Sequence, residues 1–188
     1  RATREAVLDA ATRVYALNPR ASTQEVAAAA GISRATLHRL FPSRDALIEE
    51  LGLLAVTRIN EAYAASRLDE GTALQALQRL VVTLIPVVHQ FAYLAGELQL
   101  QQSERLMAAD RDLQGQTERL LRRGQEEGSL RRDLPIAWIA HSLGGLLLAA
   151  EEAVRMDYIA PRETARLVLD SFLGGALEPS TRASAVRI

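Results

Sequence analysis

The chain has 188 residues with a formal net charge of −1, and 48% of them are hydrophobic, which is enough for one or two small domains with a buried core. It contains no cysteine, which excludes disulfides and thiolate metal sites, and no apolar run reaches the ~18 residues of a membrane span. The balanced net charge argues against a protein that coats nucleic acid over its whole surface. Because the sequence shows no export signal, we expect a soluble, cytoplasmic protein.

Positive charge is concentrated at the N-terminal end. Residues 1–44 contain seven arginines and three acidic residues, a net charge of +4, so the rest of the chain carries −5. Only 4% of the residues are aromatic, and long patterns of alanine and leucine favour helices over strands. A basic end on a helical chain indicates a surface that contacts phosphate groups.

The first predicted helix covers residues 3–17, where apolar residues such as Val7 and Ala11 recur at helical spacing. It ends at Asn18, because the following Pro19 disfavours helical backbone at the residue before it. We expect this helix to pack across the two short helices that follow, as the third member of a bundle.

Two short helical patterns joined by a tight turn lie between residues 22 and 47. Ser22 and Ser33 are predicted N-caps of the two helices, and Gly31 ends the first in the left-handed conformation that glycine accepts. The inner faces consist of apolar residues, namely Val26, Ala27, Ala30, Ile32, Leu37 and Phe41. The outer face of the second helix carries Arg34, Thr36, His38 and Arg39. The pattern is typical of a helix-turn-helix whose cationic face fits a DNA major groove, although an ordinary solvated helix face has a similar composition.

The remaining predicted elements are all helices. They cover residues 44–66, 73–91, 91–102 and 104–127, and two more are opened by Pro135 and Pro161. Pro86 lies inside the helix over 73–91 and is expected to kink or end it. The helix over 44–66 is longer than a small domain needs, so we expect it to link the helix-turn-helix to a second domain.

One block of residues matches a known pattern more specifically than a bare helix-turn-helix. The matching residues are Val7-Leu8-Asp9-Ala10-Ala11, Ser22-Thr23, Glu25-Val26-Ala27, Ala29-Ala30-Gly31-Ile32-Ser33, Thr36-Leu37, Arg39 and Phe41-Pro42-Ser43-Arg44-Asp45-Ala46-Leu47. This block resembles the DNA-binding domain of the tetracycline-repressor (TetR) family of bacterial regulators. The resemblance implies an all-α fold: a three-helix helix-turn-helix domain over residues 1–46, a helical effector-binding and dimerisation domain over 47–178, and a C-terminal tail over 179–188.

The resemblance also implies a function. It implies a homodimer that binds double-stranded operator DNA, acts as a repressor and is released by a small-molecule effector. By position, the phosphate contacts of the family fall on Ser22, Thr23, Thr36, His38 and Arg44, with His38 in place of tyrosine and Arg44 in place of lysine. The predicted DNA-binding set is completed by Ser33, Arg34, Ala35 and Arg39, since arginine suits guanine in the major groove.

Several polar or aromatic residues stand on otherwise apolar predicted helices. They are Tyr63, His89, Tyr93, Glu97, Gln101, Trp138 and His141. A ligand pocket is mostly apolar with a few placed polar groups, so the set predicts an effector pocket. Each residue alone also fits a satisfied core or surface position. If Glu97 is buried, its carboxylate favours a cationic ligand.

The last two predicted helices carry more apolar surface than the rim of a bundle needs. A dimer interface built as a four-helix bundle is therefore predicted at Leu143, Leu146, Leu147, Ala150, Leu167 and Phe172, near the small residues Gly144 and Gly145. The alternative is that these residues are buried within one subunit.

No cofactor, metal site or catalytic centre is predicted. The three histidines lie on separate predicted helices, and Ser142 beside His141 lies in mid-helix without the strand-turn-helix elbow of a hydrolase. We therefore expect a protein that is not an enzyme. Two alternatives stay open: a helix-turn-helix dimer without an effector, and an all-α enzyme or cofactor-binding bundle that carries the pattern by chance.

Overall fold

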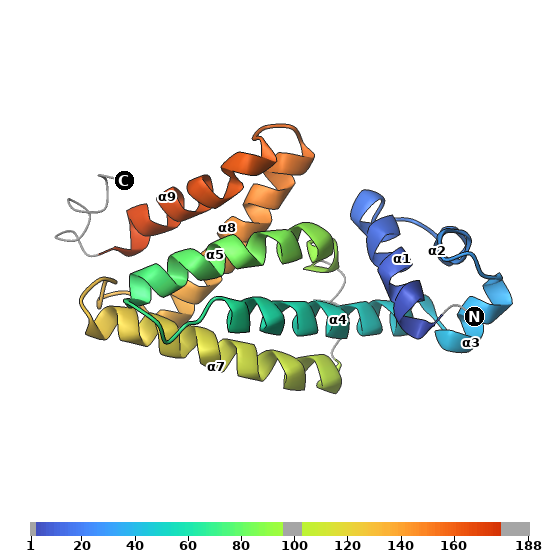
Figure 1. Ribbon diagram of the computed structural model, residues 1–188, viewed down its shortest axis with the longest axis horizontal. Helices are drawn as coiled ribbons and strands as arrows, with labels where there is room; N and C mark the ends of the chain where they lie inside the picture. The colour runs from blue at the N-terminus through green and yellow to red at the C-terminus, as the bar shows by residue number, and fades with distance from the viewer. Residues whose placement is uncertain (1–2, 96–102, 178–188) are drawn as a thin grey trace. The chain divides into compact units, whose positions relative to one another are not determined.

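The computed structural model describes residues 3–95 and 103–177, and every regular element in these two stretches is a helix. The helices are α1 (Arg4–Leu17), α2 (Thr23–Ala29), α3 (Arg34–Leu40), α4 (Arg44–Ala65), α5 (Ala73–Phe91), α7 (Glu104–Glu126), α8 (Ile136–Arg155) and α9 (Thr164–Ala176), with a short 3₁₀ turn η1 (Pro161–Glu163) before α9 (Figure 1). An isolated antiparallel bridge joins Leu130 to Leu177. The all-α prediction is confirmed.

The chain folds as two compact units. The first contains the described residues up to Arg58 together with those from His89 to Asp110, and the second contains Ile59–Val88 and the described residues from Arg111 onward. The sequence predicted a boundary between residues 46 and 47. The division by packing differs because α4, α5 and α7 each contribute residues to both units. The predicted tail over 179–188 lies outside the described residues.

The predicted helix starts are confirmed by side-chain caps. Ser22 accepts a hydrogen bond from the backbone N–H of Glu25, and Ser33 accepts one from that of Thr36. The Ser43 hydroxyl likewise accepts from the backbone N–H of Ala46 at 3.0 Å, at the start of α4. Each cap satisfies one of the N–H groups that the first turn of a helix leaves without a backbone acceptor.

The helix ends also follow the sequence, with one difference. α2 stops before Gly31, whose φ of +65° is the left-handed conformation that glycine adopts most easily. α1 stops before Asn18, as predicted. Pro86, in contrast, does not end α5, which continues to Phe91. The proline is exposed, and the opposite face of α5 is buried in the second unit through residues such as Leu80, so packing holds the helix together past the missing N–H.

Each unit has its own apolar core. The first is built on side chains with no measurable exposure, among them Val7, Tyr15, Val26 and Leu47. The second contains Leu77, Leu80, Val81, Leu121 and Ile139, each at most 1% exposed. Across the described residues, no helix combines the length and apolar character needed to cross a membrane.

Candidate nucleic-acid interface

The face that α3 presents to solvent is the centre of the candidate site. Leu37, 2% exposed, anchors the inner side of the helix in the core of the first unit. The turn before α3 is closed by a hydrogen bond of 3.0 Å from the Ile32 N–H to the Ala27 carbonyl. As a result the opposite side is free, and its exposed side chains are Arg34, Ala35, His38 and Arg39.

The two arginines of α3 have no competing partner in the part of the chain that the structure describes: no ion pair or hydrogen bond engages the guanidinium of Arg34 or Arg39. An unpaired guanidinium offers five N–H donors in a planar fork, which matches phosphate oxygens and the O6/N7 edge of guanine. The arrangement is therefore suited to reading a duplex.

All four of the predicted hydroxyl contacts are already engaged or partly covered. The Ser22 hydroxyl donates its single proton to the Glu25 carboxylate at 2.8 Å and accepts from the Glu25 N–H at 3.3 Å. The Thr36 hydroxyl lies 3.0 Å from that of Ser33, and Thr23 is half-buried. The backbone N–H of Ser22, followed by its hydroxyl, holds the pKa of Glu25 below its usual value. The capping box therefore keeps a negative charge beside Ser22, which makes it a weaker phosphate ligand than the α3 arginines.

Arg44 lies at the start of α4 and is half-buried. Its guanidinium carbon lies 5.6 Å from the centre of the Tyr15 ring, and Nη2 donates to the Pro19 carbonyl at 3.4 Å. The side chain thus ties α4 to α1 and to the turn before α2. A guanidinium carries five N–H donors, so this structural role is compatible with the predicted phosphate contact.

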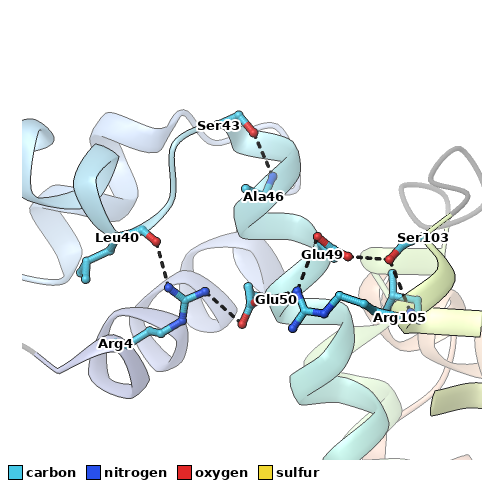
Figure 2. A network of polar contacts seen from close by, with 9 residues as sticks. Arg4, Leu40, Ser43, Ala46, Glu49, Glu50, Ser103 and Arg105 are labelled. Carbon is cyan, nitrogen blue, oxygen red and sulfur yellow. Dashed lines mark hydrogen bonds and ion pairs between the residues drawn. The ribbon is translucent and has the colours of Figure 1, made fainter. Parts of the chain in front are cut away.

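A network of charged side chains, which the sequence did not predict, contacts the C-terminal end of α3 (Figure 2). Arg4 donates to the carbonyl of Leu40, the last residue of α3, at 2.9 Å and pairs with Glu50 at 3.1 Å. Glu50 also pairs with Arg105 at 3.0 Å, while Glu49 accepts from the Ser103 hydroxyl. The network therefore connects the end of α3 to α1, to α4 and to the start of α7.

Glu50 is the central residue of this network, and it gives a pH prediction. Burial raises the pKa of Glu50, but hydrogen bonds and charges from Arg4 and Arg105 outweigh it and lower the pKa overall. Because the folded-state pKa is depressed, the stabilisation is complete above the unfolded pKa of about 4.3 and is lost as the pH falls through the folded value. We expect Glu50→Gln to lower the free energy of unfolding by about 1 kcal/mol at neutral pH.

Urea unfolding of the wild type and Glu50→Gln at neutral pH and below pH ~4 measures this difference. The difference should shrink at the lower pH, and Glu118→Gln, which removes an exposed carboxylate from the middle of α7, should show none. A difference that stays constant across the pH range would mean that the charge of Glu50 does not stabilise the fold.

Two of the predicted effector residues line different pockets, each within one unit. Tyr63 lines a pocket of about 390 Å³ in the second unit, and its hydroxyl lies 2.6 Å from that of Thr117. His89 lines a separate pocket of about 640 Å³ in the first unit, between α1, α4 and the end of α5. Glu97 and Gln101 lie outside the described residues, so those two positions stay predictions.

The other predicted effector residues have structural or surface positions. The Tyr93 ring lies 5.7 Å from the Tyr15 ring in the first unit, and burial raises the pKa of its phenol. Trp138 is 63% exposed, and His141 is exposed with Nδ1 3.0 Å from the Ala137 carbonyl oxygen. Helical periodicity places a residue on a face, but it does not say whether that face meets a cavity, a neighbour or solvent.

The predicted dimer residues lie mostly in the core of their own subunit. Leu143, Leu147, Ala150 and Phe172 are between 3% and 9% exposed because α8 packs on α9 within the chain (Figure 1). Leu146 and Leu167 are half-buried. Four of the six residues are thus core residues of their own subunit, which is the alternative that the sequence left open. Within the described residues, no cluster of three histidine or carboxylate side chains is placed to hold a metal ion.

Comparison with known proteins points to one family. The model of the tetR family of bacterial regulatory proteins matches residues 7–51, which cover α1 from Val7 onward, α2, α3 and the start of α4. The transcriptional regulator NfxB of Pseudomonas aeruginosa is 32% identical over 173 residues, covering 86% of this chain and 88% of NfxB. The repressor LfrR of Mycolicibacterium smegmatis is 39% identical over 79 residues, or 42% of each chain.

Solved structures agree over nearly the whole chain. The crystal structure of LfrR in complex with proflavine, from Mycobacterium smegmatis, has a TM-score of 0.79 at 27% identity and covers 93% of this chain and 96% of LfrR. The ketosteroid regulator KstR2 of Mycobacterium tuberculosis has a TM-score of 0.74 at 18% identity, covering 93% of this chain and 95% of KstR2, and so shares the fold.

Proposed function

Because this chain belongs to the tetR family of bacterial regulatory proteins and is a DNA-binding transcriptional regulator, we propose that it is a homodimeric repressor that reads its operator with α3 and is released by a small molecule. The observation that carries the proposal is the outer face of α3, where Arg34 and Arg39 are exposed and have no partner among the described residues. A helix of this kind fits the major groove, where arginine distinguishes guanine from other bases.

We propose a dimer interface on the exposed strip of α8 and α9 in place of the predicted core residues. Leu148 is 41% exposed, and Gly144 and Gly145 lie beside it on the exposed side of α8. A Cβ atom added at either glycine, or at Gly174 or Gly175 of α9, meets nothing within 4 Å, so these positions are open. Small residues allow the helices of a second copy to approach closely, and a two-fold axis makes such a strip complementary to itself.

Selection from a random duplex library tests the proposed DNA recognition. A dimer with two recognition helices selects a site with two inverted half-sites whose centres lie about one helical turn or a multiple of it apart. Selection of a single unrepeated half-site would contradict the homodimer. A failure to enrich any sequence at low salt would contradict sequence-specific binding by α3.

The effector part of the proposal is supported by LfrR, which was crystallised with proflavine, a flat aromatic cation. We expect proflavine at micromolar concentration to weaken binding of the selected operator by about tenfold, which corresponds to the lower part of typical allosteric couplings. Fluorescence anisotropy of labelled operator measures the release, with an unselected duplex as the control for binding of proflavine to DNA itself. Equal loss from both duplexes, or no loss from either, would remove proflavine as an effector.

A further inference from the structure

The pocket of about 390 Å³ in the second unit is lined by an unusual set of charges. It lies between the end of α4, the turn that follows α4, and the middle of α7. Its lining includes three arginines, Arg67, Arg119 and Arg123, and one acidic residue, Asp69. Arg67 is paired with Glu70 at 3.5 Å. Apolar surface is supplied by Leu68, Leu120 and the ring of Tyr63. The pocket is therefore both cationic and partly apolar.

Arg123 has a buried donor without an acceptor. Its Nε lies 3.3 Å from a Glu127 oxygen, and the other oxygen of Glu127 accepts from the Ala73 N–H at 2.8 Å, at the start of α5. Glu127 is thus fixed by two partners. The Nη2 atom of Arg123 is buried and has no hydrogen-bond partner among the described residues. A buried N–H without an acceptor is unfavourable. The Arg123 side chain as a whole is 29% exposed, so the part of it that lines the pocket is accessible to an anion.

Arg119 lies one helical turn before Arg123 on the same face of α7. Its Nη1 lies over Gly115, where an added Cβ would be 3.4 Å away, so the side chain follows the helix surface closely. Within the stretches that the structure describes, Arg119 forms no ion pair or hydrogen bond. The guanidinium is therefore available to a ligand.

The opposite rim of the pocket is held in an uncommon backbone conformation. Arg67 has a φ of +47°, in the left-handed region that residues other than glycine seldom adopt. Arg79 holds this turn by donating to the carbonyls of Ser66, Arg67 and Glu70 at 2.9, 2.9 and 2.6 Å. Strained backbone persists where the surrounding structure fixes it, and such positions gather at ligand sites.

We propose that this pocket binds a small organic anion whose carboxylate or phosphate group lies between Arg119 and Arg123. Paired guanidinium groups bind planar or tetrahedral oxyanions through charge-assisted hydrogen bonds. The apolar body of the ligand lies against Tyr63, Leu68 and Leu120. The volume is within the range of small-molecule sites, about 300–1,000 Å³. The Arg119 guanidinium, which has no partner among the described residues, favours an anion over a cation such as proflavine, so the proposal does not depend on operator release by proflavine.

Isothermal titration calorimetry with phenyl phosphate tests the site. The titration is done at physiological salt and mildly alkaline pH, where the phosphate group is a dianion. The wild type binds phenyl phosphate more tightly than inorganic phosphate, and phenethylamine, a cation of similar size, does not bind. Arg119→Gln weakens the affinity for phenyl phosphate by about tenfold or more. Arg122→Gln, which removes an exposed arginine from the same helix outside the pocket, leaves the affinity within about twofold.

Because Arg119 has no described partner in the chain, its replacement should leave the melting temperature unchanged. Arg123→Gln is a second variant that should lose affinity for phenyl phosphate. Equal affinity of the wild type and Arg119→Gln would overturn the assignment of this pocket. So would the absence of binding heat with phenyl phosphate and salicylate up to about 10 mM. Inorganic phosphate binding as tightly as phenyl phosphate would overturn the organic part of the proposal.

Discussion

Replacing both arginines on the outer face of α3, in the double variant Arg34→Ala/Arg39→Ala, should weaken binding of the selected operator by at least about 100-fold. Both side chains are exposed and without described partners, so the loss acts on DNA contacts and leaves the fold intact. A dimer loses four guanidinium groups in this variant, and each base-edge or phosphate contact contributes about 1–3 kcal/mol.

The control for this double variant is the removal of charge elsewhere. Arg122→Ala removes an exposed arginine from α7 in the second unit and should change the operator affinity by less than about threefold. Anisotropy titrations over a range of salt concentrations should also show a smaller salt dependence for the double variant. Operator affinity unchanged by the loss of both α3 arginines would mean that another surface carries recognition.

A charge on the exposed strip of α8 should separate the proposed dimer. In Leu148→Glu each copy places one carboxylate in the interface, and the two-fold axis brings two unpaired charges into one buried surface. We expect sedimentation velocity at micromolar concentration to show monomers, and operator affinity to fall by about 100-fold or more, because each half-site then binds alone. Val82→Glu, which places the same charge on an exposed position of α5 in the same unit, should remain dimeric.

The neighbouring residue gives a contrasting result. Leu147 is 6% exposed, so Leu147→Glu buries a charge in the core of its own subunit and should unfold the second unit. A folded monomer from Leu148→Glu and an unfolded chain from Leu147→Glu would locate the interface on the exposed strip. A folded monomer from Leu147→Glu would favour the interface predicted from the sequence instead.

Local features of the fold could be predicted from the sequence because their causes are local. The caps at Ser22 and Ser33 bond to residues three positions away, and Gly31 sets a backbone angle at its own position. These short-range rules fixed the limits of α2 and α3 and hence the outward face of α3. The same rules correctly ended α1 before Asn18.

Features that depend on distant partners could not be predicted. Glu50 pairs with Arg4 and Arg105, which lie far from it in the chain, and no spacing of residues in the sequence predicts these ion pairs. Helical periodicity also does not say which element packs against a given face of a helix. Leu147 and Leu148 are adjacent leucines, yet Leu147 lies in the core and Leu148 is exposed. Trp138 was assigned to a pocket by its residue type, whereas tertiary packing leaves it in solvent.

Entry of α3 into the major groove can be tested by cleavage of DNA from a fixed point on that helix. The chain has no cysteine, so Ala35→Cys gives a single thiol on the exposed face of α3, to which a phenanthroline–copper reagent can be attached. We expect cleavage within both half-sites of the selected operator, at positions related by its two-fold axis, and none from the same reagent on Ala137→Cys in α8. Protection of the operator without cleavage from position 35, or cleavage from position 137 instead, would contradict entry of α3 into the groove.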